Sequence, residues 1–253
     1  MGELKDKASN YLDSFEGESA LADVDSRKRK AAKIRAVLED EGVYAHASPT
    51  ILDIGCSFGH ILLRLVPPGG VGVGVDMDRN IGANTDNVFF VRADAENLPF
   101  RDQAFDVIVC NHVYEHTDNA ERLLAEIRRL LAADGVCYFA GPNKYEPIEP
   151  HFGLPFLSWL PRNLADRYMK LSGKGDHYAE KPLSHPRIRR LLRGFSVVEY
   201  TSRILQDPQR YAATDMLPVR SLKRRIAIAM FRVAPFFFPG FVYVLRRNDQ
   251  HRS

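Results

Sequence analysis

The stretch "ILDIGCSFGH" (residues 51–60) joins an apolar run to an aspartate and two glycines. An apolar run of this length that ends at glycine is typical of a buried strand, and the residues after Gly59 have the pattern of a helix. Glycines at such a turn let the backbone approach a ligand, and the start of a helix favours an anionic group. The stretch therefore predicts a ligand-binding turn suited to a dinucleotide, a flavin or a nucleoside. Ser57 replaces the second glycine of a dinucleotide fingerprint, which disfavours a pyrophosphate.

The residues on either side of this turn predict an α/β protein. Short runs rich in Val and Ile alternate with helical or loop segments, which indicates a parallel sheet built from right-handed crossovers. We expect strands at 50–55, 71–77, 88–94, 105–111, 135–141, 196–201 and 241–247. We expect helices at 26–42, 60–66, 119–135 and 185–195. Residues 144–182 contain five prolines and many aromatic residues, which predicts an irregular or partly helical insertion.

The composition is that of an ordinary globular protein with an uneven charge. The 253 residues are 45% hydrophobic and 26% charged, and the first twenty residues contain no apolar segment that would predict a secretory signal. The three cysteines (Cys56, Cys110 and Cys137) have no metal-binding spacing, so we expect neither disulfides nor zinc, and a cytoplasmic protein. Residues 185–253 carry fourteen Lys or Arg against four Asp or Glu, within a net charge of +3. This asymmetry predicts either a basic surface for an anionic partner or a solvated face.

The second predicted strand ends at Asp76, seventeen residues after Gly59. A carboxylate at that strand end can accept hydrogen bonds from both hydroxyls of a ribose. This position alone fits a nicotinamide cofactor and an adenosyl cofactor equally well.

The segment that follows distinguishes these cofactors. "RADAENLPFRDQAFDVIVCN" (92–111) and the following "LLAADG" (130–135) resemble the class I S-adenosylmethionine-dependent methyltransferases, in particular the small-molecule type 11-like group. With "DIGCSFG" and "GVDMD", these motifs occur in the order and spacing of that family over about residues 48–143. The resemblance implies a doubly wound, mostly parallel seven-stranded sheet with an antiparallel last strand and helical insertions. It also implies S-adenosylmethionine as cofactor. Only eleven residues separate Asp76 from Val88, so we expect the usual second crossover helix to be shortened to a turn.

The resemblance also divides the chain into regions. It implies an N-terminal helical cap (1–47), a cofactor-binding core (48–143), and an insertion that forms a substrate lid (144–184). The last region, 185–253, would complete the core and carry a basic, apolar insertion at 205–240.

The same resemblance implies roles for particular residues. Gly55, Cys56 and Gly59 would lie against the methionyl part of the cofactor, and Asp53 would order its ammonium group. Asp76 would hold the ribose beside Met77. Asp94 and the Ala95 N–H would contact the adenine ring, with Leu98 and Phe100 as its walls. Asn111 and His112 would lie beside the sulfonium.

The acceptor side offers histidines in several places. Methyl transfer depends mainly on positioning, but an oxygen acceptor usually needs a general base, for which histidine is suited. The candidates are His112, His116, His151 and His177. We expect no bound metal; the alternative is a divalent ion held by His112, Glu115 and His116, which are spaced as on one face of a helical turn.

These features predict a methyltransferase acting on a small or lipid-linked acceptor, most readily at oxygen. The alternatives are a nucleic-acid methyltransferase, which we rank lower because "NHVYEH" (111–116) replaces a base-clamping segment, and a non-catalytic methyltransferase-like binding protein. A nicotinamide oxidoreductase is disfavoured by the missing glycine-rich pyrophosphate turn. Residues 219–238 join basic residues to an apolar run interrupted by prolines, so they predict either contact with an anionic membrane surface, such as the inner face of a membrane, or packing on the core.

Overall fold

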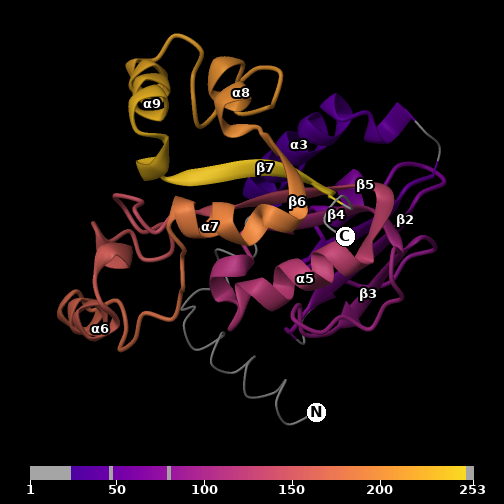
Figure 1. Cartoon of the computed structure of the whole chain (residues 1–253), viewed down its shortest axis with the longest axis horizontal. Coiled ribbons are helices and arrows are strands. Elements are labelled where there is room, and N and C mark those ends of the chain that lie inside the picture. Colours follow the sequence, from indigo (N-terminus) through magenta and orange to yellow (C-terminus); the bar gives the residue numbers. More distant parts are fainter. Residues whose placement is uncertain (1–23, 46–47, 79–80, 249–253) are drawn as a thin grey trace.

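A seven-stranded sheet runs through the centre of the protein, with helices on both of its faces (Figure 1). The computed structural model describes residues 24–45, 48–78 and 81–248. The strand order is β3-β2-β1-β4-β5-β7-β6, in which the first five strands are parallel and β7 runs antiparallel to both β5 and β6. The predicted fold class and its antiparallel last strand are therefore confirmed. The strands are β1 (Thr50–Ile54), β2 (Val71–Asp76), β3 (Val88–Arg92), β4 (Phe105–Asn111), β5 (Leu131–Pro142), β6 (Phe195–Glu199) and β7 (Gly240–Arg247).

The helices divide into two layers because each has one apolar side. On one face, α5 (Ala120–Leu130) and α7 (His185–Leu191) pack their buried residues against the sheet. On the other face lie α3 (Val24–Asp40), α4 (Leu62–Leu65) and α8 (Thr201–Gln206). The buried residues of α3 are Ala31, Ile34, Val37 and Leu38, which form the predicted helical stripe. The prediction about a secretory signal concerns residues outside the described ranges.

Two expectations about helices are tested directly. The residues between β2 and β3 form no helix over 81–87, as the short spacing predicted. The predicted helix at 119–135 is too long, since α5 ends at Leu130 and the following residues begin β5. Leu131 is extended and pairs with Phe105 of β4, so sheet pairing overrides the helical pattern of "LLAA".

The insertion after β5 folds as a short 3-10 turn, η3 (Leu157–Trp159), followed by α6 (Arg162–Leu171). It has its own small apolar cluster, in which Leu157, Ala165 and Met169 are fully buried. Phe152, Tyr168 and Tyr178 pack in or against this cluster, whereas Phe156 and Trp159 remain exposed.

The C-terminal excursion forms α9 (Leu222–Val233) and the 3-10 turn η5 (Pro235–Phe237). No residue of either element is buried, although η5 is tied down by the side chain of Asn143, which donates hydrogen bonds to the Phe236 and Phe238 carbonyls. In Figure 1, α9 stands beside α8 at the periphery of the molecule. None of the helices within the described residues has the length and apolar character to cross a membrane.

The two halves of the chain meet at the end of α3. Asp40 Oδ2 accepts hydrogen bonds from the hydroxyls of Tyr200 (2.8 Å) and Tyr211 (3.0 Å), and the carboxylate pairs with Arg203 and Arg210. These partners lie at least 160 residues further along the chain. The N-terminal helix is therefore held by the C-terminal half.

Candidate active site

The turn after β1 is shaped by backbone conformation. Gly55 and Gly59 have φ values of 73° and 76°, a region that glycine adopts without strain. A Cβ at Gly55 would stand 2.5 Å from Val113, and one at Gly59 would stand 2.3 Å from the Phe90 ring. The N–H groups of Gly55 and Cys56 both donate to the Val75 carbonyl. The glycines therefore make room for protein side chains and fix the turn on β2, which positions the residues around it.

Asp53 lies beneath this turn as a buried, incompletely satisfied carboxylate. Its side chain is only 3% exposed and its Oδ2 receives no hydrogen bond. Burial raises the pKa of Asp53 to about 7; the charge of Arg27 opposes the rise and that of Asp76 adds to it. A cationic group placed here would offset the cost of burying the charge. Asp53 thus fits the ammonium group of an S-adenosylmethionine molecule.

Asp76 is held in a fixed orientation at the end of β2. Its Oδ2 accepts from the Ser57 N–H (2.8 Å) and its Oδ1 accepts from the Asp78 N–H (3.0 Å). Each carboxylate oxygen has a second lone pair, so both remain able to accept from ribose hydroxyls. The carbonyl of the neighbouring Met77 is fixed by Arg92, whose Nε donates to it.

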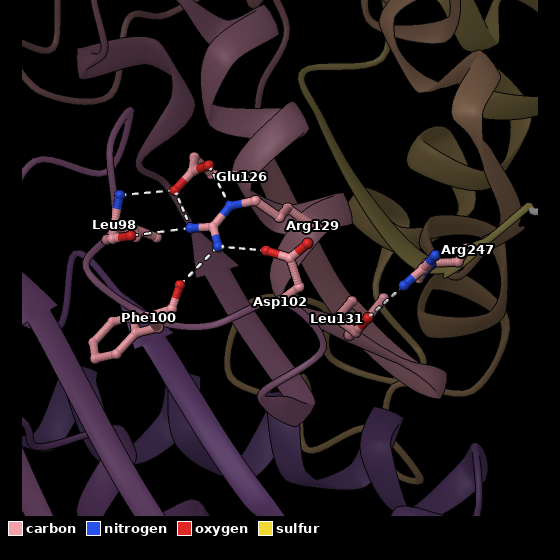
Figure 2. A network of polar contacts seen from close by, with 7 residues as sticks. All are labelled: Leu98, Phe100, Asp102, Glu126, Arg129, Leu131 and Arg247. Carbon is pink, nitrogen blue, oxygen red and sulfur yellow. Dashed lines mark hydrogen bonds and ion pairs between the residues drawn. The ribbon is translucent and has the colours of Figure 1, made fainter.

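The loop after β3, which would line the adenine, is attached to α5 by one arginine (Figure 2). The Arg129 guanidinium donates to the carbonyls of Leu98 (3.0 Å) and Phe100 (2.7 Å). It also pairs with Asp102 and Glu126, and Glu126 in turn accepts from the Leu98 N–H. Hydrogen bonds from Arg129 hold the pKa of Glu126 below its usual value. The sequence does contain a sign of this interaction, the Glu–Arg pair three residues apart in "EIRR" (126–129), but neither residue was among the predicted site residues.

Asp94 begins that loop. Its Oδ1 accepts from the Glu96 N–H (3.0 Å), which forms a tight turn. Leu98 is buried within this loop, and Phe100 packs edge-on against Phe105. The structure thus gathers Asp94, Ala95, Leu98 and Phe100 in one loop at the carboxyl end of β3, beside the end of β2.

At the end of β4, Asn111 is followed by His112, which has a left-handed backbone with φ of 57°. The His112 side chain is 44% exposed, and its Nδ1 lies 3.3 Å from Oε1 of the fully buried Glu115. The expectation that His112, Glu115 and His116 share one face of a helical turn is wrong, because the 3-10 turn η2 (Tyr114–His116) begins only after His112.

The insertion brings a third histidine to Glu115 and His116. Ligand atoms of Glu115, His116 and His151 all lie within 4.8 Å of one another, and the His116 and His151 rings meet edge-on. His112 is not in this group. His177, in contrast, is an exposed residue that faces Asp166. The structure therefore separates His112, His116 and His151, which gather near η2, from His177.

These histidines differ in their electrostatics. Burial lowers the pKa of His116 to about 4, so its imidazole is neutral near neutral pH. For His151, burial alone would lower the pKa, but the hydrogen bond to Glu149 raises it above its usual value. Burial and the nearby Glu149 raise the pKa of Glu146 to about 8. Glu146, Glu149 and Glu180 were not among the predicted site residues, since no regular pattern of residues places them beside η2.

The fold and the acidic residues at or just after the ends of β1, β2 and β3 match what the resemblance to class I methyltransferases implies. Comparison with known proteins agrees. Residues 52–139 match the family model described as "Methyltransferase domain". Residues 52–139 therefore match a methyltransferase domain, and S-adenosylmethionine is the cofactor expected of that domain.

Two relatives and one structure illustrate the similarity. The malonyl-[acyl-carrier protein] O-methyltransferase of Geobacter sulfurreducens is 32% identical over 153 residues, which are 56% of this chain and 55% of the relative. The ubiquinone/menaquinone biosynthesis C-methyltransferase UbiE of Vibrio campbellii is 32% identical over 123 residues, 45% of this chain and 47% of the relative. The crystal structure of the PH0226 protein from Pyrococcus horikoshii has the same fold, with a TM-score of 0.58, 15% identity and coverage of 94% of this chain and 99% of that one. The chain spans about half the length of these two curated relatives.

Proposed function

We propose that this protein transfers the methyl group of S-adenosylmethionine to an oxygen atom of a small or lipid-linked acceptor. The observation that carries this proposal is the pair formed by His112 and Glu115 at the end of β4. A buried carboxylate that faces one ring nitrogen holds an imidazole in one orientation. The other nitrogen of the half-exposed ring is then available to take the proton of an acceptor hydroxyl or carboxyl group.

His112 suits this role better than the two other histidines of the site. His116 is a weak base because its pKa is about 4. The Nδ1 of His151 is already engaged by Glu149 at 2.7 Å. Of the three, His112 follows directly on the end of β4, which the family resemblance places beside the methyl group, so we assign it the base and Glu115 the positioning role.

The relatives support methyl transfer without selecting the atom. One of those named above is an O-methyltransferase and the other a C-methyltransferase. The choice of oxygen therefore rests on His112.

The experiment combines S-adenosylmethionine labelled in its methyl group with a cell extract separated into lipid and aqueous fractions. We expect label to enter the lipid fraction, and His112→Gln to lower turnover by about 100-fold or more while cofactor affinity stays unchanged. His177→Gln is the matched control and should behave as the wild type. If the His112→Gln variant turned over as fast as the wild type, His112 would be excluded as the general base. Label confined to nucleic acid would support the alternative of a nucleic-acid methyltransferase.

A lipid-linked acceptor is favoured by the exposed side of α9. Leu222 and Val233 are 68% and 86% exposed, and with Ile226 they follow one side of the helix. Lys223, Arg225 and Arg232 are exposed on the same helix. We define these six residues as the α9 surface. Apolar residues flanked by cations match an anionic lipid surface, and we propose that this surface lies on such a membrane.

A series of aromatic rings leads from η5 toward the site. The ring of Phe237 packs on Tyr145, Tyr145 packs on Trp159, and Trp159 packs on Phe156, with centroids 5.1–5.6 Å apart. Trp159 Nε1 also donates to the carbonyl of Glu146, whose side chain is near η2. An apolar acceptor leaving a membrane at α9 would have a continuous aromatic path along the insertion.

A further inference from the structure

A cluster of buried carboxylates and imidazoles lies between η2 and the insertion. It surrounds a narrow cavity that is lined by four glutamates and by His151. The glutamates are Glu115, Glu146, Glu149 and Glu180. Glu115 is fully buried, and Glu180 is 5% exposed.

His151 is the one basic side chain that the described lining of this cavity offers to balance the four glutamates. Among the described residues that line the cavity there is neither Lys nor Arg. Neither oxygen of Glu180 receives a hydrogen bond, and Glu115 Oε1 lies 3.3 Å from His112 Nδ1, a longer contact than an ordinary hydrogen bond. Burying unpaired carboxylates is costly, so native proteins pair them with cations or coordinate a metal ion with them.

The histidines complete a set of ligands. Glu115, His116 and His151 can each offer one ligand atom, and these atoms lie within 4.8 Å of one another. Glu149 fixes the orientation of His151. The Oε1 of Glu149 is 2.7 Å from the Nδ1 of His151, and its Oε2 accepts hydrogen bonds from the backbone N–H groups of His151 and Phe152. A carboxylate on one ring nitrogen is the usual support for a histidine that binds metal through its other nitrogen.

We propose that Glu115, His116 and His151 bind one divalent metal ion, with Glu149 as the residue that positions His151. Two imidazoles and one carboxylate favour Zn²⁺, Mn²⁺ or Fe²⁺ over Mg²⁺ and Ca²⁺. Burial raises the pKa of the Glu180 carboxyl group, and a cation in the cavity would stabilise its charged form. Metal binding by these residues requires neither the cofactor nor an acceptor.

One consequence does rest on the proposed function. Glu115 links the metal site to His112, so an ion there would stand beside the base. A divalent ion lowers the pKa of an oxygen that it binds, which would prepare an acceptor hydroxyl for methylation.

The test uses the full chain without cofactor. Protein that has been stripped with a chelator is titrated with Zn²⁺ or Mn²⁺, and bound metal is measured by elemental analysis and calorimetry. We expect one ion per chain and a raised melting temperature, because the ion binds the folded state. In Glu115→Gln and His151→Gln bound metal should fall close to zero, and Glu149→Gln should weaken binding by about 10- to 100-fold.

His177→Gln is the matched control, since this exposed histidine lies outside the cluster. Circular dichroism verifies that each variant is folded, and His151→Gln keeps the test valid if Glu115→Gln does not fold. Failure of the wild type to retain metal, or full retention by His151→Gln, would overturn the proposal. Metal binding without methyl transfer would leave this site standing and refute only the proposed function.

Discussion

At the scale of single residues, Asp53 shows what a buried carboxylate proposed to bind the cofactor costs in stability. Its carboxylate is buried with one oxygen unpaired, and its pKa is raised to about 7 mainly by burial. Between about pH 4 and about pH 7 the folded state keeps a proton that the unfolded state has released. The free energy of unfolding therefore decreases as pH rises through this range.

We predict that Asp53→Asn makes the cofactor-free protein more stable at about pH 8, by about 1–3 kcal/mol, because the variant has no charge to bury. The advantage should shrink toward about pH 5, where wild-type Asp53 is protonated in the folded state. Denaturant unfolding at both pH values measures it, with the exposed Asp176→Asn as control. Binding of S-adenosylmethionine should weaken in the same variant. A variant less stable than the wild type at the higher pH would contradict the account.

The residues of the site were predicted unevenly. Asp53, Asp76 and Asp94 stand at the ends of predicted strands, and the carboxyl ends of parallel strands meet at one edge of a sheet, so the sequence alone places these three residues together. His151 could be named only as a candidate. Its position beside Glu115 depends on the path of an insertion without regular periodicity, which local patterns do not determine.

At the scale of elements, Arg129 determines where the loop after β3, which is proposed to line the adenine, lies relative to α5. One guanidinium holds two carbonyls of the loop and two carboxylates. Its five N–H donors in a fixed fork allow this, whereas a lysine would supply a single point charge.

We predict that Arg129→Met lowers the free energy of unfolding by about 2 kcal/mol, because it leaves the partly buried Glu126 without its partner. Cofactor affinity should fall by about 10-fold as the loop becomes more mobile, because residues that orient the binding groups without touching the ligand usually have effects of this size. Arg122→Met, an exposed position of the same helix, is the control. If calorimetry finds wild-type affinity for S-adenosylmethionine in a folded Arg129→Met variant, Arg129 does not determine the position of the loop.

The boundary between α5 and β5 shows why some elements were predicted less well. The sequence "RLLAADG" continues the helical pattern of α5 to Gly135. The chain nevertheless becomes extended at Leu131, because pairing with β4 offers hydrogen bonds and burial that local propensity does not include. The parallel sheet was predictable from the alternation of strands and helices, and the resemblance implied its antiparallel last strand, whereas this boundary depends on a tertiary contact.

At the scale of the whole molecule, the α9 surface makes membrane contact testable. We predict that the protein sediments with anionic liposomes at low salt, less at high salt, and poorly with neutral liposomes. The variant Lys223→Gln/Arg225→Gln/Arg232→Gln should lose most of this binding. Arg224 is excluded from the change because it holds the carbonyls of Leu205, Gln206 and Val219 and so anchors α9.

The control for this experiment removes the same charge elsewhere, by Arg189→Gln/Arg190→Gln/Arg193→Gln in and after α7. It should bind liposomes as the wild type does. Equal loss in both variants would indicate a general effect of net charge, and no sedimentation of the wild type would return the enzyme to acceptors that are free in solution.

The position of β7 between β5 and β6 has a consequence for how the chain is made. During translation β6 leaves the ribosome before β7, so it has no neighbour to pair with until some forty further residues have emerged. The carboxylate of Asp40 waits longer for its partners, since Tyr200 is made 160 residues after it. A nascent chain of this protein therefore exposes β6 as an unpaired strand until β7 has been made, and unpaired strand edges favour aggregation of incompletely folded chains.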